Sequence, residues 1–125
     1  MQVFYEHDSD TKLIAKKNAL ELNNWIQHLV STGEELELLV NIAKKLPEAQ
    51  NMVTSLKELA LDNKLQLGVL YRYKNSMVNI HECEDMECDT YYVNKHEEYR
   101  AEYCYILHTF SKIKIDLYNM ILLLI

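Results

Sequence analysis

Residues 99–124, YRAEYCYILHTFSKIKIDLYNMILLL, carry the pattern that decides the fold. Apolar and aromatic side chains recur in this stretch at alternating steps of four and three residues, which places them on one face of an α-helix. We therefore predict a long helix that begins near Thr90 or Asn94 and continues to the end of the chain. Its buried stripe consists of Tyr99, Tyr103, Ile106, Phe110, Ile113, Leu117, Met120 and Leu124.

The first half of the chain has the same kind of periodicity. Ser9 and Asp10 suit the N-cap position of a helix, and a helical stripe that includes Trp25 extends from there to about Ser31. The segment STGEE (31–35) contains one of only two glycines, Gly33, and two overlapping capping-box patterns. We predict a tight connection at Gly33, followed by a short helix over about 34–46.

Pro47 marks the next boundary. A proline could open a new helix at its first position or kink one continuous helix from about 34 to 79. Because a proline in a helix interior costs about 3 kcal/mol, we predict a break or a sharp kink at Pro47. A third helix then continues to about Val78, and Asn63 falls inside its main apolar stripe.

These segments predict an all-α protein. Two glycines and one proline leave few places for tight turns, and no alternation typical of strands persists. We predict a single domain over residues 1–125, built as an antiparallel bundle of three long helices plus one short helix. The short helix over about 34–46 is expected to join the third helix through the break or kink at Pro47.

Charge and cysteine content restrict the expected partners. The net charge of -6, with no cluster of basic residues, argues against binding to nucleic acid or to an anionic membrane. The three cysteines form an odd number, which favours a reducing compartment, so we expect a cytoplasmic protein. The apolar run 120–125 is far too short to span a bilayer, which requires about 20 residues.

Additional apolar positions lie away from the predicted core stripes. Ala101, Cys104, Ile115 and Leu122 fall on the back of the last helix, and Leu61, Leu65 and Val69 fall on the second side of the third helix. Three or four helices do not easily bury this much apolar surface. We therefore predict a homo-oligomer, most simply a two-fold dimer.

The segment HECEDMECD (81–89) is the densest collection of potential metal ligands. His81, Cys83, Cys88 and His96 could together form a tetrahedral nitrogen and sulfur site for zinc. Their order, H-x-C-x4-C-x7-H, departs from the short spacing of paired zinc ligands. The alternative is a solvated acidic loop between two helices, with its cysteines as small apolar anchors, and we prefer it.

Two further groups of residues could carry chemistry. Cys104 and His108 share a helix face, but an oxyanion site and a group that orients the histidine are missing from the sequence, so we prefer a packing role. Five tyrosines should meet where the third and last helices adjoin, either as a core layer or as a recognition surface. These tyrosines are Tyr71, Tyr73, Tyr92, Tyr99 and Tyr103.

The sequence therefore favours a small protein that acts through protein–protein interaction or self-association, without catalysis or a cofactor. A second possibility is a metal- or ligand-binding bundle that uses the loop 81–89 and the tyrosine-rich end. Fold class alone does not choose between them.

Overall fold

The computed structural model describes the backbone of residues 2–80 and 86–125, and the side chains of residues 13–77 and 90–125. Its elements are α1 (Gln2–Lys45), the short 3-10 helix η1 (Pro47–Ala49), α2 (Gln50–Ile80) and α3 (Met86–Leu124). The described residues contain no strand. The prediction of an all-α protein is confirmed, but three long helices replace the predicted set of four.

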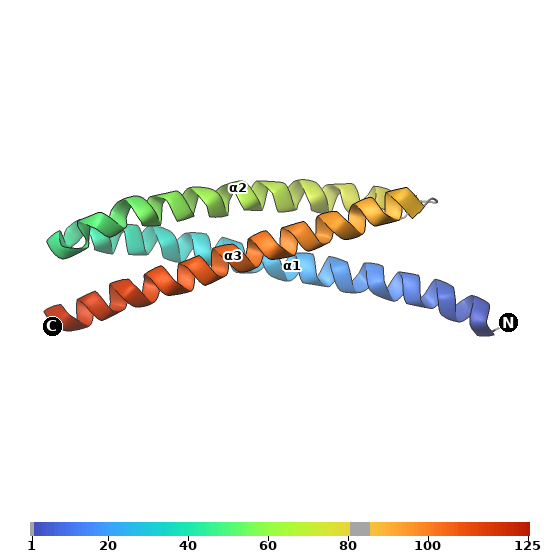
Figure 1. Ribbon diagram of the computed structural model, residues 1–125, viewed down its shortest axis with the longest axis horizontal. Coiled ribbons are helices and arrows are strands. Elements are labelled where there is room, and N and C mark those ends of the chain that lie inside the picture. Colours follow the sequence, from blue (N-terminus) through green and yellow to red (C-terminus); the bar gives the residue numbers. More distant parts are fainter. Residues whose placement is uncertain (1, 81–85) are drawn as a thin grey trace.

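The three helices reverse direction one after another (Figure 1). α1 and α2 form a long hairpin whose turn lies at one end of the molecule, and α3 returns from the other end. In Figure 1, α3 crosses α1 obliquely near its middle, so the helices diverge toward both termini. The arrangement is therefore more splayed than the regular antiparallel bundle that we predicted.

The predicted connection at Gly33 is wrong, because α1 continues through it. A glycine inside a helix costs only about 1 kcal/mol relative to alanine, which long flanking helical segments tolerate. Gly33 serves instead as a point of close approach: a Cβ atom there would lie 3.1 Å from Nδ2 of Asn63 on α2. That Asn63 nitrogen donates a hydrogen bond of 2.9 Å to the carbonyl oxygen of Leu29.

The predicted break at Pro47 is confirmed. Leu46 is extended, with φ -107° and ψ 112°, and Pro47 opens η1. The side chain of Gln50 turns back and donates hydrogen bonds to the carbonyl oxygens of Leu46 at 2.8 Å and Ala43 at 3.1 Å. Both carbonyl oxygens also accept a backbone hydrogen bond of the turn, from the amides of Ala49 and Leu46 respectively, so the Gln50 side chain reinforces the end of α1.

One predicted helix boundary is also wrong, because α3 begins at Met86 rather than at Thr90 or Asn94. α1 begins at Gln2, so the segment before Ser9 extends the helix, which is one of the two arrangements that its sequence allows. Neither segment contains glycine or proline, so nothing in it stops a helix from extending toward the N-terminus. The predicted loop 81–89 is consequently helical over its last four residues.

The core follows the predicted stripes. Leu22, Leu29 and Leu36 of α1 are fully buried, and so are Ile106 and Leu117 of α3. The last stripe residue, Leu124, is exposed because α3 diverges from α1 and α2 at that end. In the described part of the chain, no helix is both long and apolar enough to cross a membrane.

Candidate functional site: a polar junction of three helices

A buried histidine joins the three helices at one level of the molecule. His96 of α3 is only 3% exposed. Its Nδ1 atom lies 2.7 Å from the hydroxyl oxygen of Tyr73 on α2. Its Nε2 atom lies 2.7 Å from a carboxylate oxygen of Glu21 on α1. Both ring nitrogens therefore have partners, and each partner comes from a different helix.

Arg100, one turn after His96, holds the other side of the Glu21 carboxylate. Its Nε donates to one oxygen at 2.9 Å and its Nη2 donates to the other at 2.6 Å, which is a bidentate pair. These hydrogen bonds, assisted by those from His96, lower the pKa of Glu21. Arg100 also forms an ion pair with Glu97, and hydrogen bonds to the two carboxylates raise its pKa.

The environment of Tyr73 determines where the protons of the junction lie. Burial, together with the nearby hydroxyl of Tyr99, raises the pKa of Tyr73 to about 12. Tyr73 therefore keeps its proton and can donate it to Nδ1 of His96. The carboxylate of Glu21 can only accept a hydrogen bond, so Nε2 of His96 is the donor to it. Each hydrogen bond of the chain Tyr73–His96–Glu21 thus has one donor and one acceptor.

Aromatic rings surround this chain of hydrogen bonds. The Trp25 ring lies 4.9 Å from the His96 ring and 5.6 Å from the Tyr103 ring, measured between centroids. The rings of Tyr73 and Tyr99 lie 4.8 Å apart. The hydroxyl of Tyr103 lies 2.6 Å from Nδ1 of His28. The rings shield the hydrogen bond between Tyr73 and His96 from water, which strengthens it, whereas Glu21 and Arg100 each remain about one-third exposed.

The predicted tyrosine cluster is largely confirmed. Tyr73, Tyr99 and Tyr103 pack at this junction, and Tyr92 packs against the core beside them. Tyr71 does not belong to the cluster, because it is 47% exposed on the other side of α2. The packing of the other four supports the interpretation as a core layer.

Sequence reasoning missed Glu21 and Arg100. Glu21 stands four residues before Trp25 on α1, and Arg100 stands four residues after His96 on α3, so each pair shares a helix face. This spacing was the available signal. The spacing gives no information about which face of α1 lies against which face of α3. The ion pair between Glu21 and Arg100 depends on that arrangement.

Of the four proposed zinc ligands, only His96 has a side chain that the structure describes. His81 and Cys83, and the side chain of Cys88, lie outside the described residues. His96 would have to leave Tyr73 to bind a metal through Nδ1, or leave Glu21 to bind one through Nε2. The described side chains contain no group of three or more histidine, cysteine or acidic residues able to hold a metal ion.

Cys104 and His108 lie on the outward face of α3, and both are exposed. The predicted shared face is therefore correct. Both side chains point away from the core, and no second described element surrounds them. A partner helix could cover them there. The arrangement does not resemble the enclosed environment in which a cysteine and a histidine form a reactive pair.

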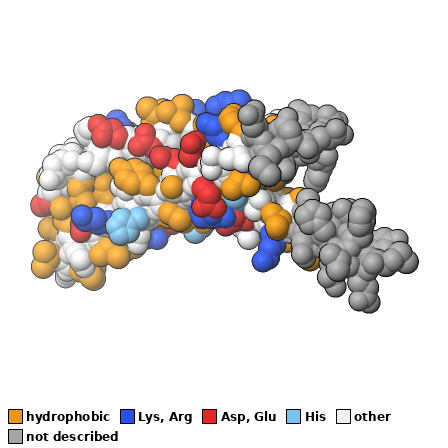
Figure 2. Space-filling model, turned by 45° about the vertical axis from the view of Figure 1, so that its right-hand side comes forward, with side chains coloured by type: hydrophobic (Ala, Val, Ile, Leu, Met, Phe, Trp, Pro, Cys, Tyr) orange, Lys and Arg blue, Asp and Glu red, His pale blue; other side chains and the backbone are white. Residues whose placement is uncertain are grey.

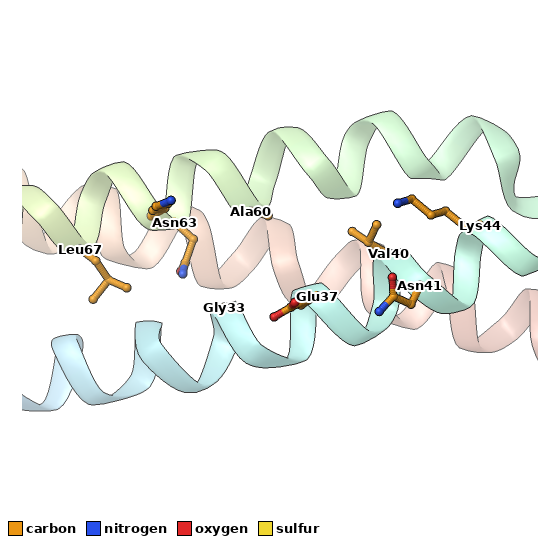
Figure 3. Close-up of a pocket in the computed structure, with 9 residues that line it drawn as sticks. Gly33, Glu37, Val40, Asn41, Lys44, Ala60, Asn63 and Leu67 are labelled. Carbon is orange, nitrogen blue, oxygen red and sulfur yellow. The ribbon is translucent and has the colours of Figure 1, made fainter.

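An open groove of about 490 Å³ lies between α1 and α2 (Figure 3). Asn63 points from α2 toward α1 near Gly33 at its edge. Oδ1 of Asn63 and Nε2 of Gln66 are buried without a hydrogen-bond partner among the described atoms. One is an acceptor and the other is a donor, and residues three apart share a helix face. The groove is lined by Gly33, Glu37, Val40, Asn41, Lys44, Ala60, Asn63, Lys64 and Leu67.

No family model, no curated protein and no solved structure matches the chain. The polar junction is buried at Tyr73 and His96 and partly exposed at Glu21 and Arg100. Its donors and acceptors satisfy one another, and its members come from all three helices. This arrangement is suited to fixing the relative positions of the helices.

Proposed function

We propose that the protein acts through helix–helix association with another protein surface, without chemistry of its own. The observation that carries the proposal is the outward face of α3, which repeats at alternating steps of three and four residues and is exposed at every position. We call this set the outer stripe. It consists of Ala101, Cys104, His108, Ser111, Ile115, Tyr118, Leu122 and Ile125.

The spacing of the outer stripe is that of a coiled-coil seam. Side chains at alternating steps of three and four residues form a continuous strip, and a second helix packs against such a strip by inserting its side chains between them. The inward stripe of α3 has the same spacing and already packs on α1 and α2. One helix thus carries two seams, and the chain itself covers one of them.

The second half of the outer stripe supplies the apolar surface. Ile115, Tyr118, Leu122 and Ile125 are each between 43% and 93% exposed. A cluster of large apolar side chains in solvent is typical of an interaction surface. Apolar side chains also appear between the charged ones over the visible face in Figure 2. Among the described side chains, the longest run of large exposed apolar residues at coiled-coil spacing is the one formed by Ile115, Tyr118, Leu122 and Ile125.

The polar junction supports the non-catalytic part of the proposal. His96 is the most enclosed histidine of the described part, and both of its ring nitrogens hold hydrogen bonds inside the molecule. A general base must reach the proton that it removes from a substrate. The contacts of His96 instead serve to join α1, α2 and α3.

Light scattering coupled to size exclusion, at micromolar concentration, tests the proposal. We expect a mass of twice the 14.8 kDa chain. Replacing Ile115 and Leu122 with glutamate should yield a monomer, because paired carboxylates cannot be buried in an apolar seam. The matched control replaces Leu61 and Leu65, which are similarly exposed on α2, with glutamate and should stay dimeric.

Two outcomes of these experiments would count against an interaction surface on α3. A parental protein that remains monomeric at every concentration, with no partner captured through the outer stripe, would contradict the proposal. Loss of the dimer in the α2 control, with the α3 variant unaffected, would move the interaction surface to α2. Circular dichroism of each variant establishes that the helices are retained.

A further inference from the structure

We propose that the occupant of the outer stripe is a second copy of this chain, with its α3 helix parallel and in register. This inference rests on the proposed function and adds the partner and its orientation. A two-fold axis would then run along the seam between the two α3 helices, and each seam residue would face its own counterpart.

The composition of the outer stripe favours this register. Its first half, Ala101 to Ser111, has small or polar side chains, whereas its second half, Ile115 to Ile125, is apolar. A parallel pairing in register places the apolar half of one copy on the apolar half of the other. An antiparallel pairing of the same full length would place Leu122 against Cys104 and leave no continuous apolar seam.

Charge favours the same orientation. Lys112 is exposed directly beside the seam. In a parallel pair, a residue on one flank of the seam lies beside the residue five positions later on the other flank in the second helix, so Leu107 of one copy lies beside Lys112 of the other. The methylene groups of Lys112 can pack on Leu107 while its amine stays in water. In the antiparallel pair of full length, Lys112 would lie beside Lys112 of the second copy, and like charges repel.

The length of the seam is sufficient for a stable pair. Residues 101–124 of α3 form a rod of about 36 Å at 1.5 Å per residue. They carry seven seam positions over more than three heptads, and the eighth, Ile125, directly follows the helix. Because α1 and α2 cover the opposite face of α3, two copies can meet along the outer stripe while each keeps its own core.

This register has a direct chemical consequence. Cys104 is a seam residue and a free, exposed thiol. Across a parallel two-fold seam, it faces Cys104 of the second copy at a separation that a disulfide can span. In an antiparallel pair, two copies of Cys104 lie far apart. Oxidative cross-linking through Cys104 therefore reports the orientation of the helices.

The experiment uses the full chain with Cys83 and Cys88 replaced by serine, which leaves Cys104 as the one thiol. Diamide accepts two electrons and two protons from two thiols as they form a disulfide. We expect most of the protein to run as a covalent dimer on a non-reducing gel. The band should disappear in Cys104→Ser, and adding Ser111→Cys to that variant should restore it, since Ser111 is also on the seam.

The matched control is Asp116→Cys in the cysteine-free chain, because Asp116 is exposed on α3 but points about 100° away from the seam residue Ile115 that precedes it. It should cross-link far less than Cys104 or Ser111→Cys. The orientation is overturned if the protein is dimeric by light scattering but the two seam cysteines cross-link no better than this control. Cross-linking only when Leu122→Cys is combined with Cys104 would show an antiparallel pair. A protein that is monomeric throughout would overturn this inference, and it would overturn the proposed function only if no other protein bound the outer stripe.

Discussion

The inward face of α3 holds Ile106, Phe110 and Leu117 against the other two helices, whereas the outward face leaves Ile115, Tyr118 and Leu122 in solvent. The two faces have the same alternation of three and four residues, and they differ in composition. The inward face is apolar or aromatic along the whole predicted stripe, while the outward face begins with small and polar residues. The comparison shows that the chain buries the more apolar stripe of α3 in its own core and leaves the less apolar stripe exposed to solvent.

The largest expected effect is the difference in free energy of unfolding between alanine substitutions on the inward and the outward face of α3. Leu117→Ala should lower the free energy of unfolding by about 2–5 kcal/mol, because it leaves a cavity in the core. Leu122→Ala removes the same atoms from a residue that is 66% exposed. It should leave the stability of the monomer nearly unchanged and weaken self-association instead. Chemical denaturation at low protein concentration, with light scattering at high concentration, measures both effects. Equal destabilisation by the two changes would show that α3 has no free face.

The second effect concerns the polar junction on the inward face. Tyr73→Phe leaves Nδ1 of His96 without its donor and should cost about 1–3 kcal/mol at neutral pH. Because the pKa of Tyr73 is raised to about 12, the parental protein gains stability from the protonated phenol below pH 10. That gain should be lost as the pH rises from about 10 to about 12.

Denaturation at a series of pH values tests this prediction. The loss of stability above pH 10 should be smaller in Tyr73→Phe than in the parental protein. Tyr71→Phe on the exposed side of α2 is the control and should behave like the parental protein. The assignment fails if both variants lose stability identically above pH 10.

The third effect tests the polar part of the outer stripe. His108→Leu places an apolar side chain at a seam position that is now polar, and polar seam residues lower the stability of a pair. We expect self-association to tighten by about tenfold, equivalent to about 1.4 kcal/mol. Sedimentation at several concentrations measures the change. Thr54→Leu, at an exposed position of α2, serves as the control. Equal tightening by both would indicate nonspecific association.

The smallest effect concerns Glu21, whose side chain is one-third exposed and therefore partly screened by solvent. Hydrogen bonds from Arg100 and His96 lower its pKa below the ordinary 4.5. A lowered pKa in the folded state contributes stability above pH 4.5, and this contribution is lost as the pH falls further. Glu21→Gln should flatten the fall in stability below pH 4.5, whereas Glu102→Gln, an exposed carboxylate of α3, should not. Identical acid profiles for the two variants would contradict this role.

The failure at Gly33 and the success at Pro47 have one physical explanation. A proline lacks the amide hydrogen and collides with the preceding turn, so its effect is local and can be predicted from the sequence. A glycine costs a helix little, so its role depends on its surroundings. At Gly33 those surroundings are the Asn63 side chain of another helix, 30 residues away in the chain.

The candidate site shows the same division. The tyrosines were expected to meet because two successive helices that reverse direction bring their adjoining ends together. The hydrogen bonds among Glu21, Tyr73 and His96 depend on the rotation of each helix about its axis and on the crossing of α1 by α3. Neither quantity is contained in the spacing of residues along one helix.

The sequence by itself determined that the chain is helical, where Pro47 interrupts it, and which residues of α3 form its two stripes. These are consequences of backbone sterics and of the helical period, which act over a few residues. Only the tertiary structure decided that α1 is continuous through Gly33 and that His96 joins three helices. Those outcomes depend on contacts between distant segments, where burial of apolar surface and pairing of polar groups select one arrangement among several that the same periodicity allows.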